Sequence, residues 1–512
     1  MLAPRAAQQP GAERPTRFAN GDRARLTIFG DGRSERLAWR IDVTGAHRFR
    51  YEVVVDATTA AVLLRRPLTE LASNALVHDY HPGAASGGTA RIVDLAADPS
   101  WLSRSAANTM LRGNNAHAYA DAGGVDGVDP GENVPASAGS DWVYPVAPFD
   151  VAEQACPAIG GQPACTWDSA AGTASAAMNR EQATTQLFYF VNRFHDHLAA
   201  APIGFTHAAR NFEFTDADGL GPARGGDPVL AEADDAAGFD NAMMTTPTDG
   251  FSPRMEMFLF GDPSLNGADA ADVVYHEYTH GLTNRSVGTG AGLSLDQSRA
   301  LGEGWSDWYA LDLLVAEGAI ADTGAPGEVS IGTYLIPGGF RRQPADCPAG
   351  AGGAACPGTA AAGSGGFTLG DLGDVGSGFE VHDDGEIWLE TLWDLRRALG
   401  SATARQLITG GLRLAPNNPS FLEARDAIIQ ADQALGGVHH TTLWQLFAAR
   451  GMGFGALTTS AAATSAAQAF DLPPVLAHET TTVTDPPPGG DGDGIAEPGE
   501  SVAVSEELRN LN

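Results

Sequence analysis

The 512-residue sequence contains no lysine: all 31 of its basic residues are arginine, against 63 acidic residues, and the formal net charge is −32. The absence of lysine by itself is equally well explained by the codon bias of a GC-rich genome. The excess of acid argues against nucleic acid as a partner, because a phosphate backbone is bound by a basic surface. A strongly acidic chain is instead typical of high solubility, cation binding, or a salty or extracellular setting.

Long hydrophobic runs are also missing. No stretch of 18 or more apolar residues occurs, so we expect no membrane-spanning helix. The first residues, MLAPRAAQQPGAERPTR, lack the apolar stretch of a signal peptide. This leaves two interpretations, a cytosolic protein or a chain that begins inside a longer precursor. The short units at both ends favour the precursor, and we expect a secreted protein.

Cysteine is scarce, with four residues in two pairs of equal spacing: Cys156 and Cys165, then Cys347 and Cys356. This spacing does not match the short C-x-x-C knuckle of a structural zinc site. Local disulfides formed in an oxidising compartment are the better interpretation. Because four cysteines allow three connectivities, local pairing is one prediction among three.

Composition divides the chain into several parts. Residues 1–25 are polar and rich in Pro, Arg and Gly, which predicts disorder. Strand-like runs fill residues 26–72, a β-rich unit too short to be a complete domain. A long central region, 73–470, is turn-rich at first and helical from about residue 270. We expect a linker over 471–490, containing TDPPPGG, and the start of a truncated β-module over 491–512.

Hydrophobic periodicity places the main elements of the central region. It predicts helices over 181–200, 270–287, 301–317, 385–399, 420–435 and 441–450. Residues 241–260 are predicted to form two strands around the turn PTDG. Residues 338–378 form a long Gly/Ala-rich insertion that holds the second cysteine pair.

The most informative motif is H-E-x-x-H, at residues 276–280 within DVVYHEYTHG. On a helix, His276 and His280 project from one face, where two imidazoles can bind one Zn²⁺ at about 2.0–2.1 Å. Glu277 then points towards the adjacent position, where a metal-bound water would lie. The alternative is an ordinary polar helix, but with 13 histidines in the chain a chance match is rare.

A catalytic zinc needs a third protein ligand and an open fourth position. The segment LGEGWSD (301–307) opens the next predicted helix, and Glu303 can supply the carboxylate ligand. Asp307, four residues later on the same face, can accept the free ring N–H of a ligand histidine, which fixes its tautomer. An E-x-x-x-D pattern alone is usually a solvated helix face, but shortly after H-E-x-x-H it indicates a His₂Glu zinc site.

A third motif, EVHDDGEIW (380–388), places His382 just before an apolar helix. Its neighbours Asp383 and Asp384 would favour the protonated imidazole. The functional interpretation is a donor to the oxyanion of a tetrahedral intermediate, and the alternative is a helix-capping loop with an incidental histidine. The remaining candidates show no spacing that closes a metal site and are expected to be structural or surface histidines: His195, His197, His439 and His440.

These segments resemble the fungalysin family of secreted zinc metalloproteases, gluzincin-type relatives of thermolysin. The resemblance is ordered along the chain and covers residues 75 to 470. Residues 26–72 resemble the C-terminal remnant of the family's propeptide. The segments that carry the resemblance are HEYTHGLTNR (276–285), GEGWSDWYA (302–310), TTQLFYFVNRFHDHL (184–198), NAMMTTPTDGFSPRMEMFLF (241–260), EVHDDGEIW (380–388) and NNPSFLEARDAIIQADQ (417–433).

The resemblance implies a two-lobed α+β fold, with a β-rich N-terminal lobe (about 73–269), a helical C-terminal lobe (about 270–470) and the active-site helix between them. It implies that one catalytic Zn²⁺ is bound by His276, His280 and Glu303. Glu277 would be the catalytic base and His382 the transition-state histidine. Asn241 and Ala242 resemble the edge-strand segment that pairs with substrate backbone. Relatives often bind calcium, so Ca²⁺ is a further candidate cofactor, whereas the 338–378 insertion departs from the family pattern.

We therefore expect a secreted zinc endopeptidase that hydrolyses internal peptide bonds through a metal-activated water. We expect it to be made as a zymogen and to be a monomer whose partners are protein or peptide substrates and its own propeptide. One rival is a catalytically silent secreted metal-binding or adhesion protein with the protease fold, against which Glu277 argues, since a zinc scaffold needs no base. The other is a surface protein in which GDGDGIAEPGE (490–500) opens a calcium-stabilised module, a loop that is equally well a solvated acidic linker.

Overall fold

The computed structural model of the chain describes residues 16–19, 21–30, 35–44, 50–67, 73–102, 109–152, 154–159, 162–215, 224–288, 292–359 and 363–510. Contacts divide the chain into two units, Met1–Ser73 with Ser103–Asn108, and Asn74–Leu102 with Thr109–Asn512. Of residues 1–25, which the sequence predicts to be disordered, 1–15 and 20 lie outside the described residues. The rest of that segment already contains strands at Thr16–Arg17 and from Arg23 onward.

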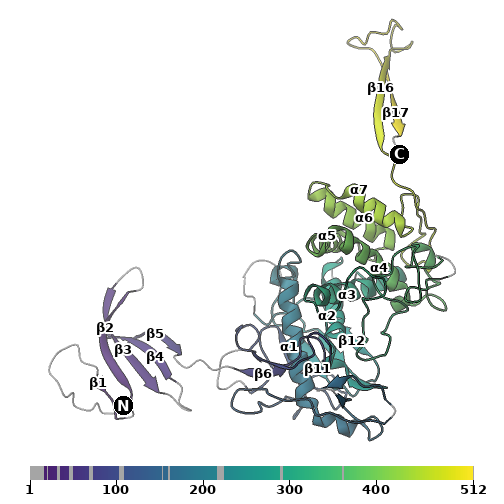
Figure 1. Ribbon diagram of the computed structural model, residues 1–512. Coiled ribbons are helices and arrows are strands. Elements are labelled where there is room, and N and C mark those ends of the chain that lie inside the picture. Colours follow the sequence, from purple (N-terminus) through teal and green to yellow (C-terminus); the bar gives the residue numbers. More distant parts are fainter. Residues whose placement is uncertain are drawn as a thin grey trace. The chain divides into compact units, whose positions relative to one another are not determined.

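The first unit is a five-stranded antiparallel sheet in the order β1-β2-β3-β4-β5, drawn in purple in Figure 1. Among its described residues, the buried apolar side chains are Ala24, Ala38 and Val54, so this sheet has a very small core. Its strands are β1 (Thr16–Arg17), β2 (Arg23–Gly30), β3 (Glu35–Thr44), β4 (Arg50–Asp56) and β5 (Val62–Pro67).

The second unit contains a mixed four-stranded sheet in the order β12-β13-β11-β8. Strand β11 is parallel to both of its neighbours, while β12 is antiparallel to β13 and forms one edge. The pair of strands predicted for 241–260 is confirmed as β12 and β13. The sheet consists of β8 (Ala116–Ala120), β11 (Val229–Ala233), β12 (Ala242–Thr245) and β13 (Arg254–Met257).

Short strand pairs and single turns of 3₁₀ helix surround this sheet. The pairs are β6 (Asn74–Val77) with β7 (Arg91–Asp94), β9 (Ala158–Ile159) with β10 (Gln162–Pro163), and β14 (Leu259–Gly261) with β15 (Ser264–Asn266). The 3₁₀ helices are η2 (Thr173–Met178), η3 (His207–Ala209), η4 (Gly267–Asp269) and η5 (Leu369–Asp371).

The helices lie mainly in the second half of the chain, coloured from teal to green in Figure 1. Helix α1 packs on β8 and β11, and α2 packs against β12 on one side and α3 on the other. The α+β class, with a β-rich N-terminal region and a helical C-terminal region, is therefore confirmed. The α-helices are α1 (Arg180–Ala199), α2 (Ala271–Ser286), α3 (Asp296–Ala316), α4 (Val381–Leu399), α5 (Ser401–Leu414), α6 (Phe421–Ala434) and α7 (His440–Ala449).

A close approach of two glycines sets the distance between α3 and α4. A Cβ added to Gly304 would lie 2.6 Å from the carbonyl oxygen of Gly385, and one added to Gly385 would lie 2.8 Å from that of Ala300. The two backbones can touch only because neither residue has a side chain. This contact brings the first turn of α4, with His382, next to Glu303 on α3.

Three helices differ from the sequence prediction. Helix α4 starts at Val381 rather than 385 because the Glu380 carboxylate caps it, accepting from the backbone N–H groups of His382 and Asp383. Helix α3 starts at Asp296 rather than 301. Helix α5 was not predicted, because its Gly410–Gly411 pair weakens the helical signal. The structure needs Gly411 there, since a Cβ would lie 2.5 Å from the side chain of Ile428.

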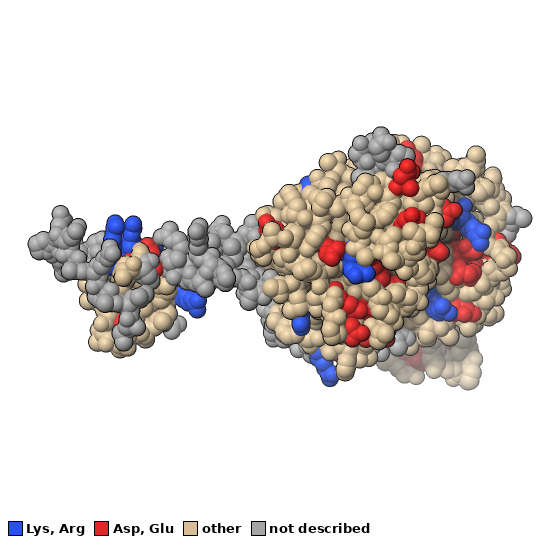
Figure 2. All heavy atoms as spheres, turned by 90° about the horizontal axis from the view of Figure 1, so that it is seen from below, with Lys and Arg blue, Asp and Glu red and all other residues tan. Residues whose placement is uncertain are grey.

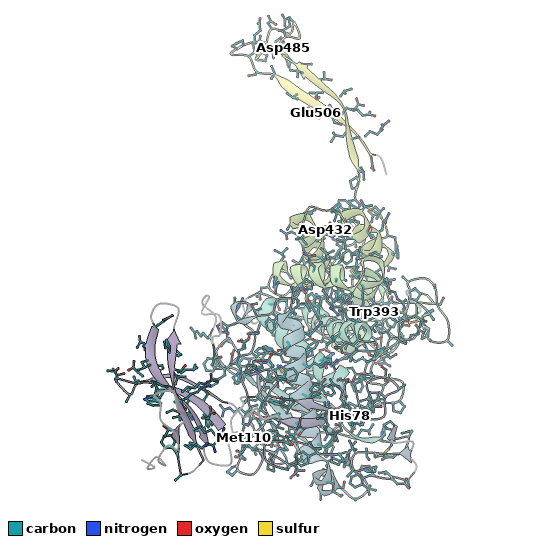
Figure 3. The ribbon with its side chains drawn as sticks, turned by 60° about the vertical axis from the view of Figure 1, so that its left-hand side comes forward. His78, Met110, Trp393, Asp432, Asp485 and Glu506 are labelled. Atoms are coloured by element: carbon teal, nitrogen blue, oxygen red, sulfur yellow. A yellow bond between two sulfur atoms is a disulfide. The ribbon has the colours of Figure 1, made fainter. Side chains whose placement is uncertain are left out.

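Both cysteine pairs form the local disulfides, Cys156–Cys165 and Cys347–Cys356. Strands β16 (Leu476–Thr484) and β17 (Ala503–Asn510) form an antiparallel hairpin, and Figure 3 shows Asp485 in the loop that joins them and Glu506 on β17. Figure 2 shows a largely uncharged face of the second unit, with small groups of carboxylates and scattered arginines. Among the residues that the structure describes, no helix combines the length and hydrophobicity needed to cross a bilayer.

Candidate metal centre

Helix α2 carries the H-E-x-x-H motif, and its first turn is fixed by a buried acid. The Asp272 carboxylate accepts hydrogen bonds from the backbone N–H groups of Val273 at 3.1 Å and Gly332 at 2.8 Å. A carboxylate in the first turn also interacts favourably with the helix dipole. Farther along α2, the Nε2 atoms of His276 and His280 lie 3.1 Å apart, as expected for side chains on one helix face.

Glu303 of α3 completes a cluster of three potential ligands. Its Oε2 lies 3.3 Å from Nε2 of His276, and its Oε1 lies 3.6 Å from Nε2 of His280. Four donors placed tetrahedrally at 2.0–2.1 Å from a zinc ion would be about 3.3–3.4 Å apart, so the three observed spacings match such a site. Glu303 Oε2 is also buried without a hydrogen-bond partner. The cluster therefore fits a metal ion with a His₂Glu donor set.

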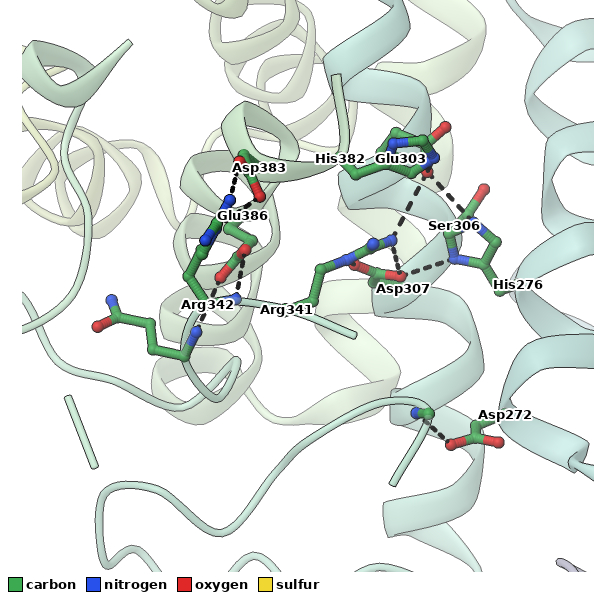
Figure 4. A network of polar contacts seen from close by, with 12 residues as sticks. Asp272, His276, Glu303, Ser306, Asp307, Arg341, Arg342, His382, Asp383 and Glu386 are labelled. Atoms are coloured by element: carbon green, nitrogen blue, oxygen red, sulfur yellow. Dashed lines mark hydrogen bonds and ion pairs between the residues drawn. The ribbon is translucent and has the colours of Figure 1, made fainter. Parts of the chain in front are cut away.

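Behind the ligands lies a network of polar groups, shown in Figure 4. Asp307 Oδ1 is 2.6 Å from Nδ1 of His276, which is the contact that the sequence predicts. Arg341 donates two hydrogen bonds to the same carboxylate, at 2.6 and 2.9 Å. Ser306 Oγ is 3.2 Å from Nδ1 of His280. Each histidine thus has a partner that orients its ring, leaving Nε2 directed at the cluster.

The charges of the cluster are strongly perturbed. Burial lowers the pKa of His280 to about 4, so this ring is neutral at pH 7 and presents a lone pair. For His276, the effect of burial is outweighed by Asp307 and Glu303, which raise its pKa to about 10. Burial opposes the charge of Glu303, but the surrounding histidines hold the pKa of this carboxyl well below its ordinary value. The centre therefore has anionic Glu303 among the ligands and anionic Asp307 behind His276, and both charges favour a cation at the ligand cluster.

Glu277 and the ligands line the same cavity, and the volume of this cavity is about 490 Å³. The side chain is 6% exposed, and burial raises its pKa to about 7, only partly offset by His276. A carboxyl group whose pKa lies near neutral pH is suited to take up and release a proton.

His382 is at the mouth of the cavity, in the first turn of α4. Its Nε2 is 3.6 Å from Glu303 Oε2, and its Nδ1 is 2.7 Å from Glu380 Oε1. The expected influence of Asp383 and Asp384 is not what the structure shows. Asp383 instead pairs with Arg342 at 2.8 Å, and Asp384 accepts from the backbone N–H groups of Gly373 and Glu380. The carboxylate beside His382 is Glu380. One of its oxygens caps the helix and the other contacts the imidazole.

Asn241 and Ala242 line the cavity from the opposite side. Ala242 is the first residue of β12, the edge strand, and Asn241 directly precedes it. Seven of the eight site residues predicted from the sequence therefore meet at one cavity, and Asp307 lies behind it. The other histidines among the described residues are elsewhere. His195, for example, is buried on α1, with its Nε2 3.4 Å from Glu213.

Sequence reasoning missed Arg341, which is buried, pairs with Asp307 and lies 3.6 Å from Glu303 Oε2. It lies in the Gly-rich 338–378 stretch that the sequence marked as an insertion. No local spacing connects it to α3, so only the fold could place it. Glu380 could have been found, because an acid two residues before a helical histidine is suited to cap that helix.

A model of the fungalysin metallopeptidase family (M36) matches residues 85–456, which include every residue of the metal centre. The chain belongs to the fungalysin family. It is 33% identical over 474 residues to the extracellular metalloproteinase MEP of Pyricularia oryzae, an alignment covering 85% of this chain and 66% of that protein. It is also 33% identical over 306 residues to the probable extracellular metalloproteinase 3 of Trichophyton verrucosum, covering 53% and 44% of the two chains. The chain thus spans between 44% and 66% of the length of these two fungalysins.

Proposed function

We propose that this fungalysin is a secreted, zinc-dependent endopeptidase that hydrolyses internal peptide bonds of proteins. The observation that supports this most directly is the convergence of His276, His280 and Glu303 at donor spacings of 3.1–3.6 Å, beside a buried carboxyl group, Glu277. The extracellular names of both relatives support secretion.

His276, His280 and Glu303 would hold the zinc ion. When bound, zinc supplies Lewis acidity, which lowers the pKa of a coordinated water and polarises a carbonyl oxygen. Asp307 keeps Nδ1 of His276 occupied, so that Nε2 faces the site. Ser306 has the same effect on His280.

Glu277 acts as general base and then as general acid. It accepts a proton from the attacking water and passes it to the leaving amine, a transfer suited to a group whose pKa is about 7. His382 donates a hydrogen bond from Nε2 to the oxyanion that forms from the scissile carbonyl. Glu380, 2.7 Å from Nδ1, fixes the orientation of this ring. One such donor typically contributes about 3–4 kcal/mol to transition-state stabilisation.

The substrate would be held by its backbone. Strand β12 is an edge strand whose first residue, Ala242, lines the cavity together with Asn241. A sheet edge is where an extended peptide can add as a further strand. We place the substrate backbone beside Asn241 and Ala242. This recognition does not depend on side chains, so it suits an enzyme that cleaves within protein chains.

We further propose that the protein is made as a zymogen, with residues 26–72 as the remnant of a propeptide. The retained β-sheet of the first unit, with its very small core, is consistent with a segment that does not function as a separate domain. We propose a monomer, for which protein substrates and the propeptide are the partners. A silent metal-binding protein is the alternative, and it gives no reason for a buried base at the cavity.

The test is the substitution Glu277→Gln, which keeps the shape of the side chain and removes its ability to take up a proton. The variant should bind zinc as the parent does and lose nearly all turnover of casein, by about 10²–10⁴-fold for a general base. Zinc content and casein hydrolysis are measured on the same preparation. Undiminished hydrolysis by the variant would refute the assignment. Both proteins are assayed after removal of the residues before 73, and hydrolysis by neither mature chain would favour the silent protein.

A further inference from the structure

Away from the metal centre, the second unit contains a buried acidic cluster that peptide hydrolysis does not use. It consists of Asp121, Glu232, Asp235 and Glu256, none of which is more than 4% exposed. Ligand oxygens of Asp121, Glu232 and Asp235 all lie within 4.8 Å of one another. Charges this close in the protein interior repel strongly, and solvent cannot screen them. Such a group is stable only with added protons or a bound cation.

The sheet topology explains why these side chains meet. Glu232 on β11 pairs in register with Glu256 on β13 and with Tyr119 on β8, so the three lie side by side across the sheet. Because the three strands are parallel, their carboxyl ends share one edge. Asp121 directly follows β8, and Asp235 comes just after β11, at that edge.

The backbone of Asp234 directs Asp235 into the cluster. Asp234 has a φ of 52°, a left-handed conformation that is uncommon for a residue other than glycine. This conformation ends the in–out alternation of β11. Asp234 therefore contacts Asn266 elsewhere, and the next residue, Asp235, takes the position beside Glu232.

Positive charge near the cluster is insufficient. Arg254 contacts Asp126, lies 3.2 Å from Glu256 and lies 3.8 Å from Glu232, so one guanidinium serves three carboxylates. Glu232 Oε1 accepts a hydrogen bond from Tyr119, but its Oε2 is buried without a hydrogen-bond partner. Oε2 of Glu256 has the Arg254 guanidinium 3.2 Å away as its partner. The Oε2 atom of Glu232 belongs to a fully buried side chain and makes no hydrogen bond, an observation that is independent of the acidic composition and points to a ligand at this position.

The electrostatics agree with the geometry. Burial raises the pKa of Glu232 to about 7, and Tyr119 and Arg254 only partly offset this. Burial also raises the pKa of Asp235 and of Glu256. All three carboxyl groups thus resist ionisation in the protein alone, which a dication at the cluster would reverse.

We propose that Asp121, Glu232 and Asp235 bind a divalent cation of the size of calcium, with Glu256 beside them. Calcium–oxygen distances of 2.3–2.6 Å allow ligand atoms up to about 4.6–5.2 Å apart, so oxygens that all lie within 4.8 Å of one another can share one such ion. Magnesium usually keeps several of its waters and is bound through one or two carboxylates, so a group of three protein carboxylates favours calcium. A donor set made entirely of carboxylate oxygens also favours calcium over zinc.

The cation would support the strand that faces the cavity. Asp235 is the second residue of the connection from β11 to β12, which ends at Asn241. Glu256 pairs in register with Met243 of β12. A cation held by these carboxylates would therefore tie the connection to the sheet and keep the edge strand in place.

The test compares calcium binding by matched variants in the full chain carrying Glu277→Gln, which prevents self-digestion, with zinc present throughout. Glu232→Gln and Asp235→Asn each remove one charge from the cluster at nearly constant volume. Glu500→Gln is the control, because it removes an acid from a separate group, Asp485, Asp491 and Glu500, in the β16–β17 loop. Equilibrium dialysis measures calcium per chain, and terbium luminescence excited through aromatic side chains such as Tyr119 reports the site directly.

We expect one calcium that both cluster variants lose, or bind at least tenfold more weakly, and that Glu500→Gln retains. Calcium at a hundred times its Kd should raise the Tm of the parent by at least about 3 °C and leave the Tm of Glu232→Gln unchanged. In calcium-free buffer, Glu232→Gln should be as stable as the parent or more stable, since it relieves repulsion. No calcium-induced rise in the parent Tm, or a rise that only Glu500→Gln removes, would overturn the proposal. If neither cluster variant folds, the absence of a calcium-induced rise in the parent Tm still refutes the proposal.

Discussion

The substitution Asp307→Asn tests whether the group behind the zinc ligands controls metal affinity. The change leaves the side-chain shape nearly intact but removes the charge that contacts His276 Nδ1 at 2.6 Å and accepts two hydrogen bonds from Arg341. Loss of such a partner of a ligand histidine typically weakens metal binding by about 10–100-fold. At 25 °C this corresponds to about 1.4–2.7 kcal/mol.

The same substitution should also lower the free energy of unfolding. Breaking a buried ion pair costs about 3–5 kcal/mol, because the remaining charge stays buried and uncompensated. Here Arg341 retains Glu303 at 3.6 Å, so we expect a loss near the lower end of that range. Urea unfolding at saturating zinc measures it, and competition with a chromogenic chelator measures the zinc affinity.

Asp312→Asn is the matched control for this experiment. Asp312 is on the same helix, is fully buried, and contacts Arg396, Ser401 and Arg405 rather than a ligand histidine. It should lose stability to a similar extent and keep the zinc affinity of the parent. If Asp307→Asn binds zinc within about threefold of the parent, or if both variants lose zinc equally, the role given to Asp307 is wrong.

Three further predictions concern the oxyanion, maturation and pH. His382→Ala should lower kcat by about 10²–10³-fold with KM and zinc content nearly unchanged; His439→Ala, at the start of α7, should change none of these, and an equal loss in both would contradict the role of His382. N-terminal sequencing of the active secreted enzyme should find a start near residue 73, whereas residues 26–68 retained at full activity would count against the zymogen. In calcium-free buffer, burial raises the pKa of Glu232 from 4.5 to about 7, so this group takes up a proton on folding. The free energy of unfolding should therefore fall by about 3 kcal/mol as the pH rises from below 4.5 to above 7. The free energy of unfolding, measured with urea, should change with pH more steeply in the parent than in Glu232→Gln, and parallel curves would refute this. The charged or titratable groups around Glu232 are Tyr119, Asp121, Asp235, Arg254 and Glu256.

The metal centre could be predicted from the sequence because its residues occur in short motifs on two helices. His276 and His280 are one helical turn apart, and Glu303 and Asp307 are likewise one turn apart, so local periodicity alone places each pair on one face. Their meeting depends only on α2 packing against α3. The fold class was accessible for a similar reason, since long amphipathic helices give strong signals.

What the sequence did not reveal depends on long-range geometry. Arg341 reaches Asp307 from a Gly-rich segment with no regular pattern. The residues of the acidic cluster lie on two strands, β11 and β13, and just after the ends of β8 and β11. A single left-handed residue, Asp234, decides which acid joins them. Helix α5 was not predicted because its two adjacent glycines have low helix propensity. In the structure, Gly411 allows α6 to pack closely against α5.

The central claim is that His276, His280 and Glu303 form the zinc site of a protease. The most direct test measures zinc by elemental analysis and casein hydrolysis on one preparation of the mature enzyme, with and without 1,10-phenanthroline. We predict one zinc per chain and cleavage that stops when the chelator removes it and returns when zinc is restored. Cleavage that persists in the zinc-free enzyme, or a fully zinc-loaded mature chain that cleaves nothing, would contradict the account.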